Sequence, residues 1–448
     1  MKVSAREVAR RVLRRVDSDG AFVSLALAGE LERAELSAED RGLATEIAYG
    51  VVRHRSRLGR ALAAYAARGI AKLSPAVRVA LEAAAYQLLF LDRVPDYAAV
   101  DDAVDAVRRV AGPRVAGFAN GLLRRLAREG EPALPDPSAD LRAHLEIACS
   151  LPPVVLDELA RAAPEGELAA AASALTAPAP LWARVDPLHP VDLGPLLSAE
   201  RSGAAAEPSV LCREAFRLTG AGSPEASASF QDGLWTVQDL GAQLVGHLVA
   251  PAAGMRILDA CAGVGGKATH LAQLAGGRAH IDAADQSARK LDLLTDTARR
   301  LGLTSIAAIE SDLTRPGEEL AADYDAILLD APCTGLGVIR RHPELKWRLR
   351  ASAVDELAAL QRRLLAALWP RLRPGGLLVY SVCTFTRAEG PDQIARFIAE
   401  TPGATVEPPA TDDSVRDWSH VVGADGFLRT WPHRHDADAF FAARIRRR

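Results

Sequence analysis

Residues 257–267 read Ile-Leu-Asp-Ala-Cys-Ala-Gly-Val-Gly-Gly-Lys, a short apolar run followed by a glycine-rich turn. Glycines at such a turn let the backbone approach a ligand closely and let a helix begin tightly against the preceding strand. Apolar residues at helical spacing follow up to residue 274. The stretch therefore predicts the first strand, turn and helix of an open α/β sheet.

Alternating strand and helix patterns continue through the C-terminal half of the chain. The predicted strands are 255–259, 279–284, 306–310, 324–330, 376–382 and 439–445, and the predicted helices are 267–274, 287–301 and 354–368. Alternation of this kind indicates right-handed crossover units and a mostly parallel sheet. The predicted fold class is therefore α/β.

The N-terminal part has a different pattern. From residue 5 to about 128, apolar residues recur at helical spacing without strand-like alternation, and three prolines then fall within residues 130–137. Proline clusters of this kind are typical of linkers. We predict an all-helical domain at 1–130, a small α+β subdomain at 140–235 and the α/β domain at 236–448.

Composition narrows the class of protein. The chain has 448 residues, a formal net charge of -3 and five cysteines without CxxC spacing. The odd, scattered cysteines predict a reduced cytoplasmic protein without disulfides or a bound metal, and no apolar run approaches the ~20 residues that a membrane-spanning helix needs. A basic stretch at 338–350 is the one local charge asymmetry that follows a predicted strand end directly.

Three carboxylates follow successive predicted strands. Asp259 precedes the glycine turn, Asp285 ends the second strand and Asp312 follows the third. Ligands of open parallel sheets bind outside the carboxyl ends of the strands. There, carboxylates can meet ribose hydroxyls, an adenine amino group or a methionyl ammonium, so both a dinucleotide and S-adenosylmethionine fit this pattern.

Two cysteines lie at the ends of the next predicted strands, in Asp330-Ala-Pro-Cys333-Thr-Gly and in Ser381-Val-Cys383-Thr. A single cysteine is most often a small buried apolar residue. A pair at the functional edge of a sheet instead indicates methylation of a pyrimidine carbon, because carbon 5 of cytosine becomes nucleophilic only after a thiolate adds to carbon 6. The sequence pattern alone does not assign the two cysteines separate roles.

These motifs resemble the bacterial ribosomal RNA cytosine-5 methyltransferases of the RsmB (Fmu/Sun) type. Residues 46–53 and 86–95 resemble the NusB-like RNA-binding domain of that family, residues 233–239 resemble the start of its catalytic domain, and residues 341–347 resemble its basic substrate loop. The resemblance implies a Rossmann-like class I S-adenosylmethionine-dependent methyltransferase sheet. It also implies an all-α NusB-like N-terminal domain and the small α+β subdomain between them.

The resemblance also implies roles for the motif residues. The methionyl part of S-adenosylmethionine would be held by the turn residues, which are Cys261, Ala262, Gly263, Val264, Gly265, Gly266 and Lys267. Asp285 would hold the ribose, Asp312 the adenine edge, and Asp330 both the cofactor side and the cytosine edge. Cys383 would attack carbon 6, and Cys333 would assist removal of the carbon 5 proton and product release.

The sequence departs from the family at three places. The family has Ala-Pro where Gly263-Val264 stands, a threonine where Val382 stands, and Glu-Asn where Gly390-Pro391 follows Glu389. None of these changes removes a reacting group.

The implied reaction is methylation of carbon 5 of a cytosine in free 16S ribosomal RNA, for which the family target is cytosine 967. We expect a monomer without a metal or membrane partner. Two alternatives stay open: a transfer RNA cytosine-5 methyltransferase, and a catalytically silent RNA-binding factor in ribosome assembly.

Overall fold

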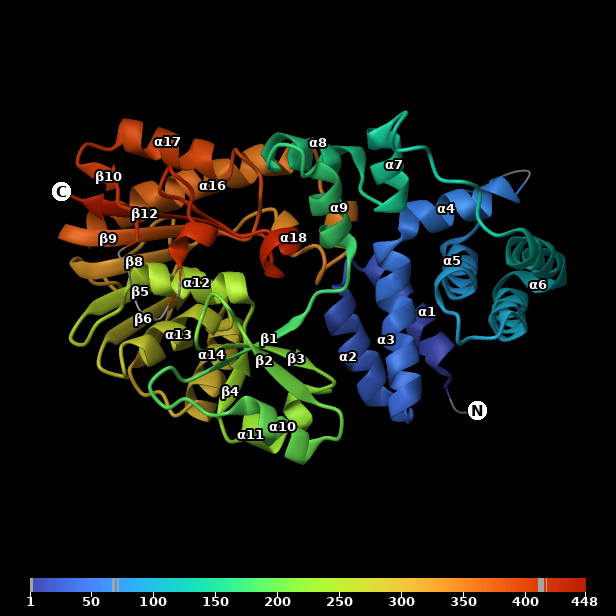
Figure 1. Cartoon of the computed structure of the whole chain (residues 1–448), viewed down its shortest axis with the longest axis horizontal. Coiled ribbons are helices and arrows are strands. Elements are labelled where there is room, and N and C mark those ends of the chain that lie inside the picture. Colours follow the sequence, from blue (N-terminus) through green and yellow to red (C-terminus); the bar gives the residue numbers. More distant parts are fainter. Residues whose placement is uncertain (1–2, 67–68, 71, 410–414, 416) are drawn as a thin grey trace. The chain divides into compact units, whose positions relative to one another are not determined.

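In the computed structural model, the strands predicted after residue 254 lie side by side in one sheet (Figure 1). The structure describes residues 3–66, 69–70, 72–409, 415 and 417–448. The elements around this sheet are α12 (Leu240–Val249), β5 (Arg256–Ala260), α13 (Gly266–Leu274), β6 (His280–Asp285), α14 (Ala288–Arg300), β7 (Ile306–Glu310), β8 (Tyr324–Asp330), α16 (Ala353–Leu368), β9 (Leu372–Val382), α17 (Pro391–Glu400), β10 (Ala404–Val406), β11 (Leu428–Arg429) and β12 (Phe441–Arg447).

The strand order is β10-β12-β9-β8-β5-β6-β7, with β11 paired to β12. Strands β5 to β9 run parallel to one another. Strand β12 pairs with β9 and runs antiparallel to it. The chain moves outward from β5 first through β6 and β7 and later through β8 and β9. The order therefore reverses at β5, and such a reversal creates the crevice in which open α/β sheets bind ligands. The prediction of a Rossmann-like, mostly parallel sheet is confirmed.

Both faces of this sheet are buried. Alternate residues of β5 and β8 point to opposite faces of the sheet. On one face, Ile257 and Leu328 pack with α12, α13 and α14. On the other face, Leu258 and Leu329 pack with α16 and α17. Successive side chains of a strand point to opposite faces, so a strand covered on both sides is apolar throughout. This explains the unbroken apolar run at residues 326–329.

A smaller antiparallel sheet precedes the large one. Its order is β2-β3-β1-β4, and its elements are β1 (Leu181–Val185), α10 (Leu193–Glu200), β2 (Ala205–Pro208), β3 (Ala215–Thr219), α11 (Ala228–Gln231) and β4 (Trp235–Val237). One face packs with α10 around Leu193, Leu197 and Trp235.

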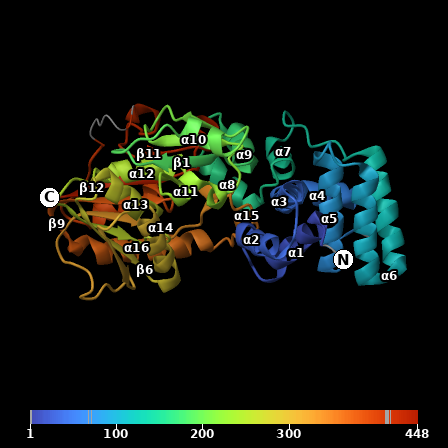
Figure 2. The ribbon, with the colours of Figure 1, turned by 90° about the horizontal axis from the view of Figure 1, so that it is seen from below.

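The N-terminal part is helical (Figure 2). Its helices are α1 (Ala5–Ser18), α2 (Val23–Arg33), α3 (Ala38–Arg53), α4 (Arg55–Ala64), α5 (Pro75–Phe90), α6 (Asp96–Glu129), α7 (Leu141–Ala148), α8 (Pro153–Ala162) and α9 (Leu168–Thr176). Helix α6 is interrupted at Gly112, which has a φ of 78° and precedes Pro113. At Gly50 of α3 a Cβ would lie 2.0 Å from the Tyr86 ring of α5, so only glycine allows this approach.

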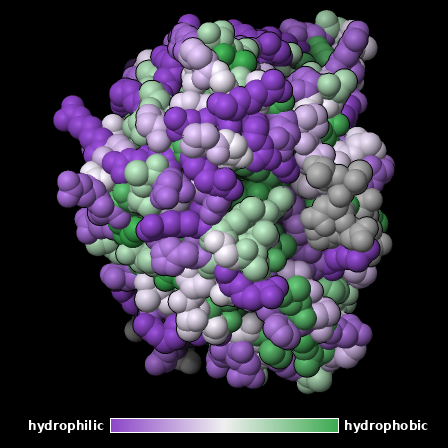
Figure 3. All heavy atoms as spheres, turned by 90° about the vertical axis from the view of Figure 1, so that its left-hand side faces the viewer, coloured by the Kyte–Doolittle hydropathy of each residue, from purple (hydrophilic) through white to green (hydrophobic). Residues whose placement is uncertain are grey.

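The chain forms two compact units. One comprises residues 1–160, 164–177 and 339–349, and the other comprises 161–163, 178–338 and 350–448. The predicted three-part division at residues 130, 140 and 235 stays a prediction. Among the described residues no helix is both long and apolar enough to cross a membrane. The face in Figure 3 is mostly hydrophilic, with apolar side chains interspersed among the polar ones.

Candidate active site

Four predicted site residues border one cavity at the carboxyl ends of the parallel strands. The cavity has a volume of about 260 Å³ and is lined by Cys261, Asp285, Gln286, Lys290, Ser311, Asp312, Leu313, Thr314, Asp330, Pro332, Leu360 and Leu364. Cys261, Asp285, Asp312 and Asp330 thus reach the same space from β5, β6, β7 and β8. The structure brings together the residues that the sequence places after four separate strands.

The glycine-rich turn borders this cavity and is fixed to β6. The Gly263 amide donates to Asp285 Oδ2 at 3.0 Å, and Gly263 has a φ of 57°. Gly265 has a φ of 84°, and a Cβ there would lie 2.4 Å from Leu294 Cγ. Glycine is therefore required at 265 by both its backbone conformation and its packing. Val264 is 53 % exposed, so the valine that replaces the family's proline displaces no core residue.

A buried arginine of the small sheet forms hydrogen bonds with α13, the helix that follows the glycine-rich turn. The sequence patterns did not predict this residue. Arg184 of β1 is fully buried and donates to the carbonyl of Gly266 at 3.1 Å, to Thr269 Oγ1 at 3.2 Å and to Gln273 Oε1 at 3.0 Å. Burial lowers the pKa of its guanidinium to about 9. Arg184 therefore stays charged near neutral pH and fixes the helix that follows the turn.

Lys267, the last residue of the turn motif, points back to Asp330 at the end of β8. Lys267 Nζ donates to Asp330 Oδ2 at 2.6 Å, and Ser381 Oγ donates to Asp330 Oδ1 at 2.6 Å. Burial lowers the pKa of Lys267, but attraction to Asp330, with which it also forms a hydrogen bond, outweighs this effect and raises the pKa overall. Asp330 is thus held from two sides, by β5's turn and by β9.

The two cysteines lie next to each other. Cys333 Sγ and Cys383 Sγ are 3.4 Å apart, and both residues are partly exposed. The loop between them is tied back to β9, because the Gly337 amide donates to the Cys383 carbonyl at 3.0 Å. A Cβ at Gly337 would lie 1.9 Å from the Ala439 carbonyl oxygen, so this close approach also requires glycine.

The electrostatic surroundings of the two sulfurs differ. The pKa of the Cys333 thiol is raised well above its usual range by its hydrogen bond with Cys383, by burial and by the Glu389 carboxylate. Cys383 instead interacts with the Lys267 ammonium. The two sulfurs therefore have charged neighbours of opposite sign, a carboxylate beside Cys333 and an ammonium beside Cys383.

Asp259 does not line the cavity, although the sequence grouped it with Asp285 and Asp312. Its carboxyl group is fully buried in β5. Desolvation, together with the negative charge of Asp330, raises its pKa to about 8. Asp259 is therefore uncharged in the cofactor-free protein at neutral pH.

The raised pKa of Asp259 predicts that the free energy of unfolding depends on pH. A carboxyl whose folded pKa lies above its unfolded value of about 3.9 stabilises the protein at low pH, and this stability is lost as the pH rises through about 8. We expect denaturant titrations of the cofactor-free protein to show that the free energy of unfolding falls between pH 5 and pH 9. In Asp259→Asn, that fall should be smaller by at least about 2 kcal/mol. Asp323→Asn, at an exposed carboxylate, should leave the fall unchanged. Equal slopes for all three proteins would contradict a neutral Asp259.

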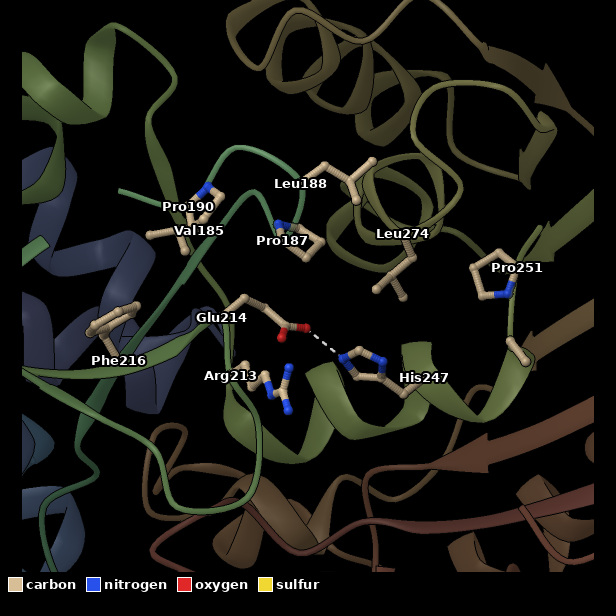
Figure 4. Close-up of a pocket in the computed structure, with 11 residues that line it drawn as sticks. Val185, Pro187, Leu188, Pro190, Arg213, Glu214, Phe216, His247, Pro251 and Leu274 are labelled. Atoms are coloured by element: carbon tan, nitrogen blue, oxygen red, sulfur yellow. Dashed lines mark hydrogen bonds and ion pairs between the residues drawn. The ribbon is translucent and has the colours of Figure 1, made fainter. Parts of the chain in front are cut away.

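A second cavity, of about 610 Å³, lies between β1, β3 and α12 (Figure 4). Its lining includes Glu214 and His247, and Cys212 lies beside them, so that three side chains able to bind a metal lie within 4.8 Å of one another. However, Glu214 Oε1 accepts hydrogen bonds from His247 Nε2 at 2.5 Å and from His270 Nε2 at 3.1 Å. Hydrogen bonding accounts for this convergence, and the expected absence of a metal stays a prediction.

Comparison with known proteins identifies the family. The model of the 16S rRNA methyltransferase RsmB/F family matches residues 247–446, and the NusB family model matches residues 3–128. A relative from Synechocystis sp., named probable ribosomal RNA small subunit methyltransferase B, is 32 % identical over 99 % of this chain and 100 % of its own length. The chain belongs to this family.

Two further similarities agree with that assignment. The ribosomal RNA small subunit methyltransferase B of Serratia proteamaculans is 32 % identical over 92 % of this chain and 91 % of its own length. The crystal structure of PH0851 has the same fold, with a TM-score of 0.81 and 23 % identity over 99 % of both chains. The protein is therefore an S-adenosylmethionine-dependent methyltransferase with an all-helical NusB domain, and the predictions of family, enzyme class and cofactor are confirmed.

The cavity at the strand ends fits that cofactor chemically. Asp285 and Asp312 offer carboxylates for hydroxyl and amino groups, whereas Leu313, Pro332 and Leu364 offer apolar contacts for a flat ring. Asp312 Oδ1 accepts from the Thr314 amide at 3.0 Å and from its hydroxyl at 2.7 Å, which fixes the carboxylate. Polar groups placed beside apolar side chains in one cleft are typical of a nucleoside site.

The segment that resembles the family's basic loop packs within the helical unit. Residues 339–349 belong to the helical unit, and Lys346 in α15 (Leu345–Arg348) is only 2 % exposed. Lys346 Nζ donates to the Arg53 carbonyl at 2.8 Å, and Trp347 Nε1 donates to the Val52 carbonyl at 2.7 Å. These donors cap the C-terminal end of α3, where unpaired carbonyls favour a cation. The side chains of Lys346 and Trp347 are therefore bonded to the backbone of α3, and the role of residues 341–347 as a substrate loop stays a prediction.

Proposed function

We propose that this protein methylates carbon 5 of a cytosine in 16S ribosomal RNA through a temporary bond between Cys383 and carbon 6 of the base. The observation that supports the proposal most directly is the pair of sulfurs, 3.4 Å apart, at the ends of β8 and β9. Asp330 connects them to the cofactor cavity, because it lines that cavity and also accepts a hydrogen bond from Ser381, two residues before Cys383.

The reaction begins with the base. The Cys383 thiolate adds to carbon 6, and the electron pair of the 5,6 double bond moves toward carbon 5 while nitrogen 3 is protonated or hydrogen-bonded. Asp330 lies at the end of β8 and supports that change at the cytosine edge. S-adenosylmethionine, when bound, supplies the methyl group that carbon 5 takes.

Cys333 completes the cycle. Once its thiol has lost its own proton to solvent, the Cys333 thiolate accepts the proton of carbon 5. The 5,6 double bond then forms again, and the bond between carbon 6 and Cys383 breaks, which returns Cys383 as a thiolate. While Cys383 is bonded to carbon 6 it carries no negative charge. The interactions with Cys383 that raise the pKa of Cys333 are then lost, so Cys333 becomes easier to deprotonate at the step that needs a base.

The turn and the strand-end carboxylates hold the cofactor. Residues 261–267 would hold its methionyl part, Asp285 its ribose and Asp312 its adenine edge. Asp285 Oδ1 already accepts from the Ser287 amide at 3.0 Å and Oδ2 from Gly263. Each oxygen keeps a second lone pair, so a bound ribose hydroxyl adds to these contacts without replacing them.

The substrate is small-subunit ribosomal RNA, as in the names of the relatives. A base must leave its stack before a thiol can reach carbon 6, which favours single-stranded or loop RNA in free 16S rRNA. Cytosine 967 is the proposed target. The helical domain at 1–130 binds the RNA, and the protein acts as a monomer in the cytoplasm.

Bisulfite mapping tests this proposal. We expect one cytosine of 16S rRNA to lose its protection when the gene is deleted, and purified protein with S-adenosylmethionine to restore it on free 16S rRNA. Methylation of transfer RNA with 16S rRNA unchanged would instead identify a transfer RNA methyltransferase. Absence of S-adenosylmethionine binding in calorimetry would identify a silent assembly factor.

A further inference from the structure

Glu389 is a buried carboxylate on the chain that leaves β9 beyond Cys383, and the proposed reaction does not use it. Its carboxylate accepts four hydrogen bonds, all from uncharged donors: the Thr334 amide at 2.9 Å, Thr334 Oγ1 at 2.6 Å, Thr386 Oγ1 at 2.8 Å and Gln361 Nε2 at 3.1 Å. Its side chain is fully buried. A buried carboxylate is costly unless donors satisfy it, so this arrangement needs a structural or functional reason.

Three of the four donor groups belong to the two cysteine-bearing loops, and the fourth is Gln361 of α16. Thr334 is the residue after Cys333, whereas Thr386 lies three residues after Cys383. The two loops also meet directly, since Thr334 Oγ1 and Thr384 Oγ1 are 2.9 Å apart. Gln361 of α16 reaches the first loop a second time, donating to the Pro332 carbonyl at 2.9 Å. Glu389 is therefore the common acceptor that ties the loop after β8 to the loop after β9.

We propose that Glu389 is a positioning residue for both sulfurs: its carboxylate fastens Thr334 to Thr386 and so keeps Cys333 and Cys383 on the same side of one base. The inference rests on the proposed function for its catalytic meaning. Misplacement of a reacting group by about 1 Å can cost about 100-fold in rate. The two-cysteine mechanism needs both sulfurs in place within one turnover, so it is sensitive to this distance.

A purely structural role is the competing explanation, and direct measurement of sulfur proximity separates the two. Diamide oxidises two neighbouring thiols to a disulfide and is itself reduced to the hydrazine, taking up both thiol hydrogens. In Glu389→Ala we expect disulfide formation between Cys333 and Cys383, detected by mass spectrometry, to slow by at least about 10-fold. Glu389→Gln keeps the shape of the side chain and one carbonyl acceptor. Its rate of disulfide formation should therefore lie between the rates of Glu389→Ala and the unmodified protein.

The matched control is Glu407→Gln. Glu407 accepts hydrogen bonds from Arg444 and Arg446 of β12. Strand β12 belongs to the same sheet as β8 and β9, but this ion pair lies away from the cysteines. This variant should lose stability without changing the rate of disulfide formation. All variants are compared well below their melting temperatures, so that loss of folded protein does not account for the result.

Single-turnover methylation gives the second readout. Glu389→Ala should lower the rate of methyl transfer to RNA by about 10- to 100-fold, with the KM values for RNA and cofactor within about threefold of the unmodified protein. Unchanged disulfide formation in Glu389→Ala would overturn the positioning role, whatever the methylation result. If the unmodified protein lacked methyltransferase activity, the proposed function would fail, but the disulfide rates would still decide the role of Glu389.

Discussion

Cys383→Ser is expected to abolish methylation of RNA, lowering turnover by at least about 10⁴-fold. A serine hydroxyl fits the space of the thiol, but it does not ionise near neutral pH and is a far poorer nucleophile toward a ring carbon. The cofactor cavity is not lined by Cys383, so S-adenosylmethionine should still bind. Transfer of a labelled methyl group to 16S rRNA measures the loss, and calorimetry measures the binding that remains.

Cys149→Ser is the matched control, because Cys149 is a buried thiol in the helical unit and takes no part in the proposed chemistry. It should keep turnover within about threefold. The nucleophile assignment would be wrong if Cys383→Ser methylated RNA at nearly the normal rate. Loss of activity in Cys333→Ser together with activity in Cys383→Ser would show that the two cysteines have exchanged roles.

The parallel sheet was predictable because its signals are local. Residues 324–330 form β8 as predicted, and the apolar run at 326–329 within it reflects burial on both faces of the sheet. Helix α16, at Ala353–Leu368, lies within one residue of its prediction. Strand β2 was missed, since Ala205–Pro208 is short and largely exposed at the edge of the small sheet. An edge strand without a buried face leaves no apolar alternation in the sequence.

The site was predictable only where motif residues stand at strand ends. Cys261, Asp285, Asp312 and Asp330 follow successive strands, and the carboxyl ends of parallel strands meet at one edge, so their convergence on one cavity follows from the pattern. The roles of the two cysteines did not follow from it. Their different surroundings depend on Lys267 and Glu389, which approach from other loops.

The supporting contacts join residues that are far apart in the sequence. Arg184 reaches Gly266 across 82 positions, and Lys346 reaches Arg53 across 293. An arginine in a five-residue strand and a lysine in a basic stretch both resemble solvent-facing residues when the sequence is read locally. Only the packing of the surrounding elements decides that each is buried and satisfied by specific carbonyl groups.

Cys333→Ala is expected to trap the reaction after methyl transfer. With Cys383 bonded to carbon 6 and the methyl group on carbon 5, release requires loss of the carbon 5 proton, and alanine cannot accept it. Multiple turnover should fall by at least about 100-fold, while a covalent complex of protein and RNA accumulates. A denaturing gel with labelled 16S rRNA measures the complex as a band of reduced mobility that contains both molecules.

The double variant Cys333→Ala, Cys383→Ser separates this trap from tight noncovalent binding, because it lacks the sulfur that forms the bond and should give no such band. The sulfurs are 3.4 Å apart, so Cys333 would lie on the face of the ring that Cys383 attacks. Accumulation of the complex in Cys383→Ser instead of Cys333→Ala would reverse the assignment. Normal turnover without any complex in Cys333→Ala would mean that another group, such as water ordered beside Asp330, removes the proton.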